Sequence, residues 1–461
     1  MQTNQTFDYI DEVRILESYI HGCWHASSTQ GIVPQHAVTG EPVSSVSSDG
    51  VDLSAAVDHA RYVGGPALRS MTFPERAALL KAMGQLLIAE KEVLYELSAA
   101  TGATRADSSI DIEGGAGVLL GYASRGRREL PDGHVLVDGD PEILSRDGSF
   151  LGIHIATPRR GVAVQINAFN FPVWGTLEKL APTLLAGVPT IVKPATPTAF
   201  MTEAMVRLII EAGILPDGAL QLVCGRVDGL FNLLDGQDHV AFTGSADTAA
   251  MLRSHPTLSA RSVRFNAEAD SLNAAILGEA AVPGSDEFSL FVTEVVQEMT
   301  VKAGQKCTAI RRALVPTPQL DAVAEALASA LAGVRVGDPA DADTDMGALV
   351  GVTQREEVRG AVMAMRASAD VVVDHCEFHG VNPKVGAFLA PTLLRASDPN
   401  DDAVHTTEAF GPVCTLLGYD GPDDAVRLTA LGSGSLVASV VTPDANEAAA
   451  LTLGIAAHHG R

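Results

Sequence analysis

The chain has 461 residues, enough for two or three domains, and its 46% apolar and 19% charged content is typical of a packed globular protein and excludes disorder. Acidic residues outnumber basic ones by 56 to 32, and the net charge of −24 disfavours binding to nucleic acid or to an anionic membrane surface. A phosphorylated cofactor stays compatible with this charge, because a few well-placed donors can bind it locally.

Five scattered cysteines, without a CxxC or HExxH motif, argue against a disulfide framework or a zinc cluster. The acidic, polar first residues differ from a signal peptide, and no run of about 18 apolar residues could span a bilayer. His458 and His459 have no carboxylate or cysteine at ligand spacing, so no metal site is expected. These features predict a soluble, cytoplasmic protein with reduced thiols.

Residues 73–102 carry apolar side chains at helical spacing, with Pro74 in a plausible first turn, which predicts one amphipathic helix or a pair of helices. Residues 134–160 contain two short apolar runs and the turn-forming sequence DGDPE, a pattern that predicts a two-stranded ribbon. Because an isolated ribbon is marginal in water, we expect it to pack on another domain or another subunit.

Five short β-type runs alternate with helical patterns in the next part of the chain. The runs are 161–167, 189–195, 219–225, 239–245 and 262–268. This alternation predicts a parallel sheet covered by helices, with ligands beyond the carboxyl ends of the strands. The residues at those ends are Asn167–Asn170, Lys193, Gly225 and Thr243–Ser245. The sequences CGRVDG and FTGSAD each precede an expected helix, whose start favours an anion.

A second α/β region follows from about residue 273 to the end of the chain. It has a long helical pattern over 287–304 and strand patterns in RRALVP (311–316) and LVASVV (436–441). The coarse organisation is therefore two α/β regions and a ribbon.

Cys307, in KAGQKCTAIRR, follows the long helical pattern and comes directly after Lys306. A thiol near positive charge or a helix end ionises more easily, and the thiolate is a nucleophile. A free cysteine is more often a small buried hydrophobe, so both roles stay open.

Glu268 ends the fifth expected strand, where it could act as a general base with a raised pKa or be a solvated loop acid. Asn170 follows the first of these strands, and its amide could donate to an oxyanion or form a turn.

Taken together, a thiol, a carboxylate, an amide donor and two glycine-bearing strand ends match a thiol-based oxidation of an aldehyde. In this chemistry the thiolate attacks the carbonyl, hydride leaves to a nicotinamide, and a base-activated water cleaves the thioester. The common GxGxxG fingerprint does not follow the first strand.

The chain resembles the aldehyde dehydrogenase superfamily over essentially its whole length. The motifs that carry the resemblance are, in order, NAFNFP, IVKPA, FTGSA, a strand-end Glu, GQKCTA, VGDP followed by MGALV, GAFLAPTLL and EAFGP. The resemblance implies an α/β fold with a Rossmann-like cofactor domain (1–133 and 161–272), an oligomerisation β-ribbon (134–160) and a catalytic thiol domain (273–461). It also implies a homodimer or a higher homo-oligomer.

The family's functional roles carry over to matching positions. Cys307 resembles the nucleophile, Glu268 the base and Asn170 the oxyanion donor. Lys193 resembles the adenosine-ribose ligand, Gly244 and Ser245 line the cofactor, and Glu408 with Phe410 resembles the nicotinamide-ribose contact.

Within the superfamily, the chain is most similar to the ring-cleavage semialdehyde dehydrogenases of aerobic aromatic catabolism through CoA thioesters, and above all to the PaaZ type of phenylacetate degradation. The runs concerned include MTFPERAALLKA, TGATRADSSIDIEGG, EADSLN and EMTVKAGQKCTAIRR. The resemblance implies NADP-dependent oxidation of a semialdehyde of the 3-oxo-5,6-dehydrosuberyl-CoA type to its acid. The alternative is the shorter 3,4-dehydroadipyl-CoA semialdehyde of benzoyl-CoA catabolism.

Two departures from the family pattern, and the presence of the base, bear on the chemistry. Thr196 stands where many NAD-preferring relatives carry an acid, which permits NADP, with NAD still possible. Arg226 could assist the 2′-phosphate or could equally be a solvated loop arginine. Asp270 and Ser271 replace the glycine pair after the base, so the backbone there is uncertain. Relatives that pass the acyl group to free CoA generally lack the base, so Glu268 favours hydrolysis.

The family pattern extends beyond AAHHGR461 with a strand, an active-site loop and an oligomer strand, and the PaaZ type adds a hydratase domain of hot-dog fold. We therefore expect a shortened chain, in which an unpaired sheet edge would limit activity. A non-catalytic fragment that binds nucleotide is the alternative from another class.

Overall fold

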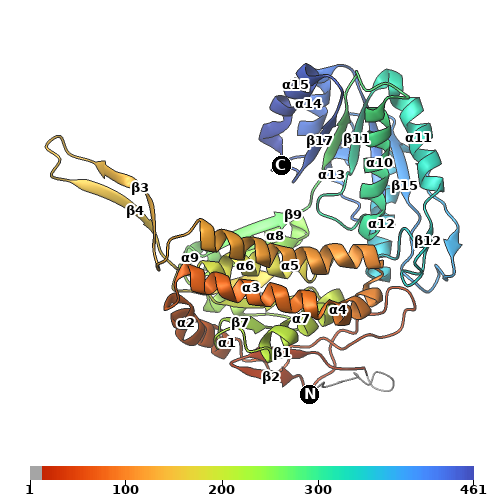
Figure 1. Cartoon of the computed structure of the whole chain (residues 1–461). Helices are drawn as coiled ribbons and strands as arrows, with labels where there is room; N and C mark the ends of the chain where they lie inside the picture. The colour runs from red at the N-terminus through yellow and green to blue at the C-terminus, as the bar shows by residue number, and fades with distance from the viewer. Residues whose placement is uncertain (1–12, 461) are drawn as a thin grey trace. The chain divides into compact units, whose positions relative to one another are not determined.

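The computed structural model describes residues 13–460, which fall into two compact units (Figure 1). The first unit comprises Met1–Gln35 (described from residue 13), Pro42–Ser98 and Ser108–Ala269. The second comprises His36–Glu41, Ala99–Asp107 and Asp270–Arg461 (described to residue 460). The main border lies a few residues before the expected one at 272, and two short N-terminal segments join the second unit. The roles expected of the two units stay predictions.

The first unit contains a seven-stranded sheet in the order β2-β1-β7-β6-β5-β8-β9. Its strands are β1 (Glu17–Ile20), β2 (Cys23–Ala26), β5 (Ala163–Ile166), β6 (Thr190–Lys193), β7 (Leu220–Leu222), β8 (His239–Gly244) and β9 (Arg264–Ala269). Strands β5 to β9 pair in parallel, in the Rossmann arrangement whose order reverses between β5 and β8. All five strands expected between 161 and 268 are confirmed, whereas β1 and β2 come from a segment without a sequence prediction.

Helices cover both faces of this sheet. On one face, α1 (Leu53–His59) and α8 (Ala246–Arg253) contribute apolar side chains to a core with β5, β6 and β8. On the other face, α6 (Trp174–Leu185) contacts β5 and β6, and α3 (Phe73–Ala89) packs against α6 and α7 (Ala199–Glu211). The parallel sheet is therefore buried on both sides, as the apolar strand sequences require.

The helical pattern over 73–102 forms two helices, α3 and α4 (Lys91–Ser98). Thr72 and Glu75 form a reciprocal capping box at the start of α3, with a proline in its first turn. The helix expected after CGRVDG is wrong, because only a short 3-10 turn forms at Leu230–Leu233. Gly229 before it is left-handed and Leu234 after it is extended, so no α-helix can propagate.

The expected ribbon is present as β3 (Leu136–Ile143) and β4 (Leu151–Ala156), which pair antiparallel with each other and with no other described strand. Figure 1 shows it extending away from the sheet and helices of its own unit. Val137 lies opposite Ile155, and Ile143 lies opposite Leu151, so these four side chains share one face. Their exposed fractions are 52 to 69%, which leaves an uncovered apolar surface.

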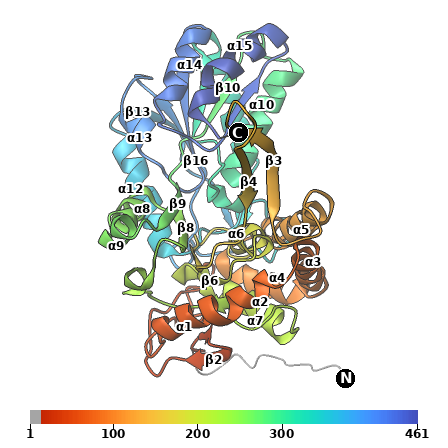
Figure 2. The ribbon, with the colours of Figure 1, turned by 90° about the vertical axis from the view of Figure 1, so that its left-hand side faces the viewer.

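The second unit has a six-stranded sheet in the order β13-β15-β16-β11-β10-β17. Its strands are β10 (Ala274–Leu277), β11 (Arg312–Pro316), β13 (Ala369–Val373), β15 (Thr392–Ala396), β16 (Val413–Tyr419) and β17 (Ala438–Val441). Helices α10 (Asp286–Thr300) and α11 (Leu320–Ala332) share an apolar core with one face of this sheet. Helices α14 (Pro422–Ala430) and α15 (Ala445–Ile455) pack together on the other face (Figure 2).

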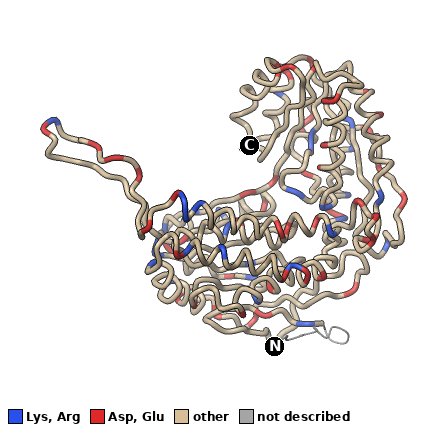
Figure 3. Tube along the Cα trace, in the orientation of Figure 1, with Lys and Arg blue, Asp and Glu red and all other residues tan. Residues whose placement is uncertain are grey.

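Within residues 13–460, none of the helices combines the length and apolar character needed to cross a bilayer. Figure 3 shows acidic and basic positions interspersed along both units. The acid excess of the chain is therefore distributed over many positions and does not by itself indicate a functional site.

Candidate functional site

Asn170 lies in the loop that leaves β5 and enters α6, and its side chain is 8% exposed. Asp111, from α5 (Arg105–Arg128), accepts hydrogen bonds from the backbone N–H groups of Val173 (3.2 Å) and Trp174 (2.8 Å). The Thr198 hydroxyl donates to the Phe169 carbonyl at 3.1 Å. The loop that carries Asn170 is thus held from two sides within the first unit.

Lys193 ends β6, the strand next to β5, and burial lowers the pKa of its ammonium group, with Arg226 lowering it further. Thr196 begins the 3-10 turn Thr196–Thr198 three residues later and is partly exposed. Arg226 is exposed and forms a two-point ion pair with Asp228, at 2.7 and 3.2 Å. Its guanidinium therefore already has a carboxylate partner in this structure.

Glu268 lies near the end of β9, directly opposite Thr243 of β8, and is partly exposed. Ser245 caps α8 by accepting from the backbone N–H of Thr248 at 3.3 Å, which confirms the helix expected after FTGSAD. A Cβ on Gly244 would lie 2.6 Å from the Phe242 ring, so a side chain at this strand end would have to displace that ring. The edge of the first sheet thus offers a carboxylate and a helix start on neighbouring strands.

The thiol loop, residues 301–307, follows α10 in the second unit. Lys302, Ala303 and Gly304 have positive φ angles of 56°, 50° and 68°, three left-handed residues in a row. Left-handed backbone is costly for residues with a Cβ, so contacts have to stabilise it. Asp107 accepts from the Lys302 N–H at 2.8 Å, and the Gln305 side chain donates to the Lys302 carbonyl at 2.9 Å.

Cys307 is partly exposed, and the Asn273 amide donates to its carbonyl at 2.8 Å and to the Ala309 carbonyl at 2.9 Å. Lys306 pairs with Glu298 at 2.6 Å. The positive charge expected to favour the thiolate is therefore largely neutralised by this carboxylate, and Lys306 is a poor explanation for a reactive thiol.

The other cysteines differ from Cys307 in their surroundings. Cys224 and Cys414 are fully buried, and burial raises the pKa of Cys414 to about 12 and that of Cys224 further. Burial also raises the pKa of the half-buried Cys376 to about 11. Cys23 is exposed on β2, at the edge of the first sheet. The structure thus holds three of the other four thiols in the protonated, unreactive form.

Glu408 and Phe410 precede β16 in the second unit. Burial raises the pKa of Glu408 to about 7, although Arg311, at 3.6 Å, lowers it. The Glu408 Oε1 atom is buried and accepts no hydrogen bond. An orphaned acceptor of this kind fits a hydroxyl donor such as a ribose, so the residues present are compatible with a nicotinamide nucleotide.

The predicted site residues form two groups, one in each unit. Asn170, Lys193, Thr196, Gly244, Ser245 and Glu268 lie at the carboxyl ends of parallel strands in the first unit. Cys307, Glu408 and Phe410 lie around the thiol loop in the second unit, where Arg311 contacts the loop, the carboxylate and the ring. Asp270, two residues after Glu268, has a positive φ of 34°, which the glycine of the family pattern would favour. The buried Ser271 hydroxyl donates to the side-chain oxygen of Asn273 at 2.6 Å.

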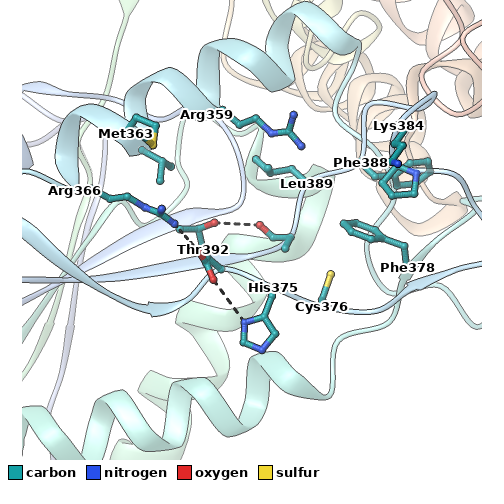
Figure 4. Close-up of a pocket in the computed structure, with 14 residues that line it drawn as sticks. Arg359, Met363, Arg366, His375, Cys376, Phe378, Lys384, Phe388, Leu389 and Thr392 are labelled. Atoms are coloured by element: carbon teal, nitrogen blue, oxygen red, sulfur yellow. Dashed lines mark hydrogen bonds and ion pairs between the residues drawn. The ribbon is translucent and has the colours of Figure 1, made fainter.

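A pocket of about 500 Å³ lies elsewhere in the second unit, beside the second half of α12 (Val352–Met365) (Figure 4). Its charged side chains are largely paired, since Arg366 and His375 contact Asp374 and Arg359 contacts Glu356. None of the predicted site residues lines it. The pocket therefore adds nothing to the candidate site.

Sequence reasoning missed the residues that hold the site loops. Asp111, Asn273, Gln305 and Arg311 are buried polar residues, each with at least one backbone partner more than 30 positions away in the sequence. Only a polar residue inside an apolar pattern could have indicated them, and such a residue does not identify its partner.

A sequence model of the aldehyde dehydrogenase family matches residues 24–457. A 3,4-dehydroadipyl-CoA semialdehyde dehydrogenase from Aromatoleum evansii is 46% identical over 452 residues, which are 97% of this chain and 87% of the relative.

Solved structures share the fold. An aldehyde dehydrogenase from Mycobacterium tuberculosis, complexed with NAD+, aligns with a TM-score of 0.84 and 26% identity over 96% of this chain and 89% of its own. A betaine aldehyde dehydrogenase from Staphylococcus aureus, in complex with NAD+, aligns with a TM-score of 0.85 and 22% identity over 96% and 85% of the two chains.

We expect Asp111→Ala to lower the free energy of unfolding by about 2–4 kcal/mol, because two backbone N–H groups lose a charged acceptor. Urea denaturation measures this loss, and hydrogen exchange at residues 171–176 should become faster. Glu113→Ala, on the same helix, is the control, since its carboxylate contacts Lys91 and Tyr95 instead. Unchanged exchange in the Asp111 variant would contradict the anchoring role.

Proposed function

The chain belongs to the aldehyde dehydrogenase family and is an NAD(P)-dependent aldehyde oxidoreductase, and from this premise we propose that it oxidises a CoA-linked semialdehyde of the 3,4-dehydroadipyl type to the carboxylic acid. The 46% identity to a dehydrogenase of that name, over 97% of this chain, is the observation that carries the proposal. It favours the shorter semialdehyde over the 3-oxo-5,6-dehydrosuberyl compound that motif resemblance put first.

We propose that Cys307 is the nucleophile. Its thiolate attacks the aldehyde carbon, and the amide of Asn170 donates a hydrogen bond to the oxygen that becomes negative. A bound nicotinamide would supply the acceptor for the hydride of this carbon, so Cys307 would then hold the acyl group as a thioester. The high thiol pKa values of Cys224, Cys376 and Cys414 support Cys307 in this role.

Glu268 completes the proposed cycle as the general base. It takes a proton from water, the hydroxide attacks the thioester carbon, and the Cys307 thiolate leaves, so the carboxylic acid is released and the thiol restored. The position of Glu268 at a strand end, partly exposed, supports this role because the carboxylate is accessible to water. CoA then belongs to the substrate and is not the acyl acceptor.

For the cofactor, we propose that Lys193 and Thr196 bind the adenosine ribose, Gly244 and Ser245 line the nucleotide, and Glu408 with Phe410 contacts the nicotinamide ribose. Thr196 carries no charge that would repel a 2′-phosphate, which supports NADP. Arg226 is exposed, and its ion pair with Asp228 uses only part of its donor set, so the remaining N–H groups support binding of that phosphate. The five free thiols support a reducing, cytoplasmic location.

We propose further that the ribbon joins copies of this chain into a homo-oligomer, because its apolar face is uncovered and its edges are unpaired. Ile153→Lys with Ile155→Lys should shift the protein toward smaller species in sedimentation experiments. His154→Lys, on the opposite face of β4, should leave the distribution unchanged. A wild-type monomer would contradict the proposal.

The central test is a single-turnover assay with NADP and each of the two CoA semialdehydes, followed by absorbance of the reduced nicotinamide. We expect a burst equal to the enzyme concentration and continued turnover in the wild type, with the higher kcat/KM for the dehydroadipyl compound. Glu268→Gln should retain the burst and then stall, whereas Cys307→Ala should bind cofactor without a burst. An unchanged steady state in Glu268→Gln would refute the assigned base.

Thr196→Glu should raise the KM for NADP by more than about tenfold while the KM for NAD changes little, because the new carboxylate repels the 2′-phosphate. Thr196→Gln, of similar size and no charge, separates repulsion from steric effects. Steady-state kinetics with both cofactors measure the ratio, and an unaltered ratio in the glutamate variant would disprove the cofactor argument.

A further inference from the structure

Arg311 is a buried cation that contacts both the thiol loop and the segment that carries Glu408 and Phe410. It comes directly before β11, and its side chain is only 3% exposed. Its guanidinium donates to the carbonyls of Gly304 at 2.8 Å and Lys306 at 3.2 Å, which flank the turn into Cys307. It also donates to the Gly411 carbonyl at 2.7 Å, in the segment that carries Glu408 and Phe410.

The remaining guanidinium nitrogen faces Glu408. Arg311 Nε lies 3.6 Å from Glu408 Oε1, too far for a hydrogen bond, and neither atom has another hydrogen-bond partner. The guanidinium carbon also lies 5.3 Å from the centre of the Phe410 ring. One side chain thus contacts the thiol loop and both residues proposed to hold the nicotinamide ribose.

The two segments approach each other closely at this point. A Cβ on Gly304 would lie 2.1 Å from the Gly411 carbonyl oxygen, and Gly304 is left-handed, so only glycine fits. Because both carbonyls accept from Arg311, the guanidinium sets the spacing between the segments at their closest approach.

Burial makes this arrangement electrostatically sensitive. It lowers the pKa of Arg311 and raises that of Glu408 to about 7. Within this unit, the charged groups that face Glu408 are Arg311, which lowers its pKa, and Asp270, which raises it. Glu298 and Cys414 face Arg311 in turn. Arg311 is the cation that lowers the pKa of Glu408, and a hydrogen bond from the Ser271 backbone N–H lowers it as well.

We propose that Arg311 is a positioning residue for hydride transfer. It holds the Cys307 loop and the segment of the ribose-binding Glu408 at a fixed spacing, and it keeps the Glu408 carboxylate available as a hydrogen-bond acceptor. The inference rests on the proposed roles of Cys307 and Glu408. Arg311 itself touches neither substrate nor cofactor in this scheme. Its effect is exerted through the three carbonyls and the carboxylate.

The test compares Arg311→Met, Arg311→Lys and the control Arg76→Met. Arg76 is a fully buried arginine of the first unit that also donates to three carbonyls, those of Leu185, Leu68 and Met71. Its replacement therefore controls for the general loss of stability that follows when a buried guanidinium is removed from three carbonyls. Two quantities are measured: the dissociation constant of NADP as a function of pH, by equilibrium titration without aldehyde, and the single-turnover rate of nicotinamide reduction.

In Arg311→Met the pH midpoint of NADP binding should move upward, because Glu408 loses the cation that lowers its pKa and the ionised carboxylate accepts a ribose hydroxyl more strongly than the neutral acid does. The single-turnover rate should fall on the order of 10²-fold through misplacement of the reacting groups. Arg311→Lys should restore the midpoint but not the rate, since one ammonium group cannot hold three carbonyls and a carboxylate. Arg76→Met should change neither quantity.

A wild-type midpoint and rate in Arg311→Met would overturn the proposal, as would equal losses in Arg76→Met. If Arg311→Met does not fold, Arg311→Lys decides, and a wild-type single-turnover rate in that variant overturns the positioning role. If the wild type itself gives no burst with either semialdehyde, the proposed function fails. The role of Arg311 is then decided by a single measurement, the pH dependence of NADP binding in the wild type and in Arg311→Met.

Discussion

Parallel pairing of β5 with β6 and β8, and of β8 with β9, is the constraint on which the first half of the candidate site depends. Parallel strands end at the same edge of their sheet, so backbone hydrogen bonds alone place Asn170, Lys193 and Glu268 along one edge. The loops after the strands need further support, because a strand end does not orient a side chain. Asp111 provides it for Asn170, and the capped start of α8 provides it after Gly244.

The second unit holds its candidate residues in a different way. Its thiol loop contains three consecutive left-handed residues, a backbone that costs about 1–2 kcal/mol for each residue with a Cβ. Buried polar side chains offset that cost, since Asn273, Gln305 and Arg311 bind the carbonyls of the loop from separate positions. These contacts are buried or partly buried, so removing one leaves a carbonyl without its hydrogen-bond donor and not merely a cavity.

Burial also shifts the pKa values of several titratable groups by different amounts. It keeps Cys414 and Cys376 protonated, with pKa values of about 12 and 11, and it brings Glu408 to about 7. Acidic and basic residues are interspersed along the chain of both units, so their positions along the chain carry no such information (Figure 3). In this acidic chain, the informative charges are the few that are buried, among them Lys193 and Arg311, whose pKa values burial lowers.

The sequence by itself determined the positions of the five parallel strands, the ribbon and the helices on either side, because apolar periodicity and capping are local properties. It also indicated the family, through motifs such as GQKCTA and EAFGP, while the roles of Cys307, Glu268 and Asn170 stay predictions. Only the tertiary structure showed that a helix is absent after Gly229, that Glu298 neutralises Lys306, and that Arg311 binds Gly304 and Gly411. The contact of Arg311 with Gly411 joins residues 100 positions apart, and a local pattern contains no record of so distant a partner. The first two outcomes depend on backbone angles and a side-chain pairing that the residue types alone do not specify.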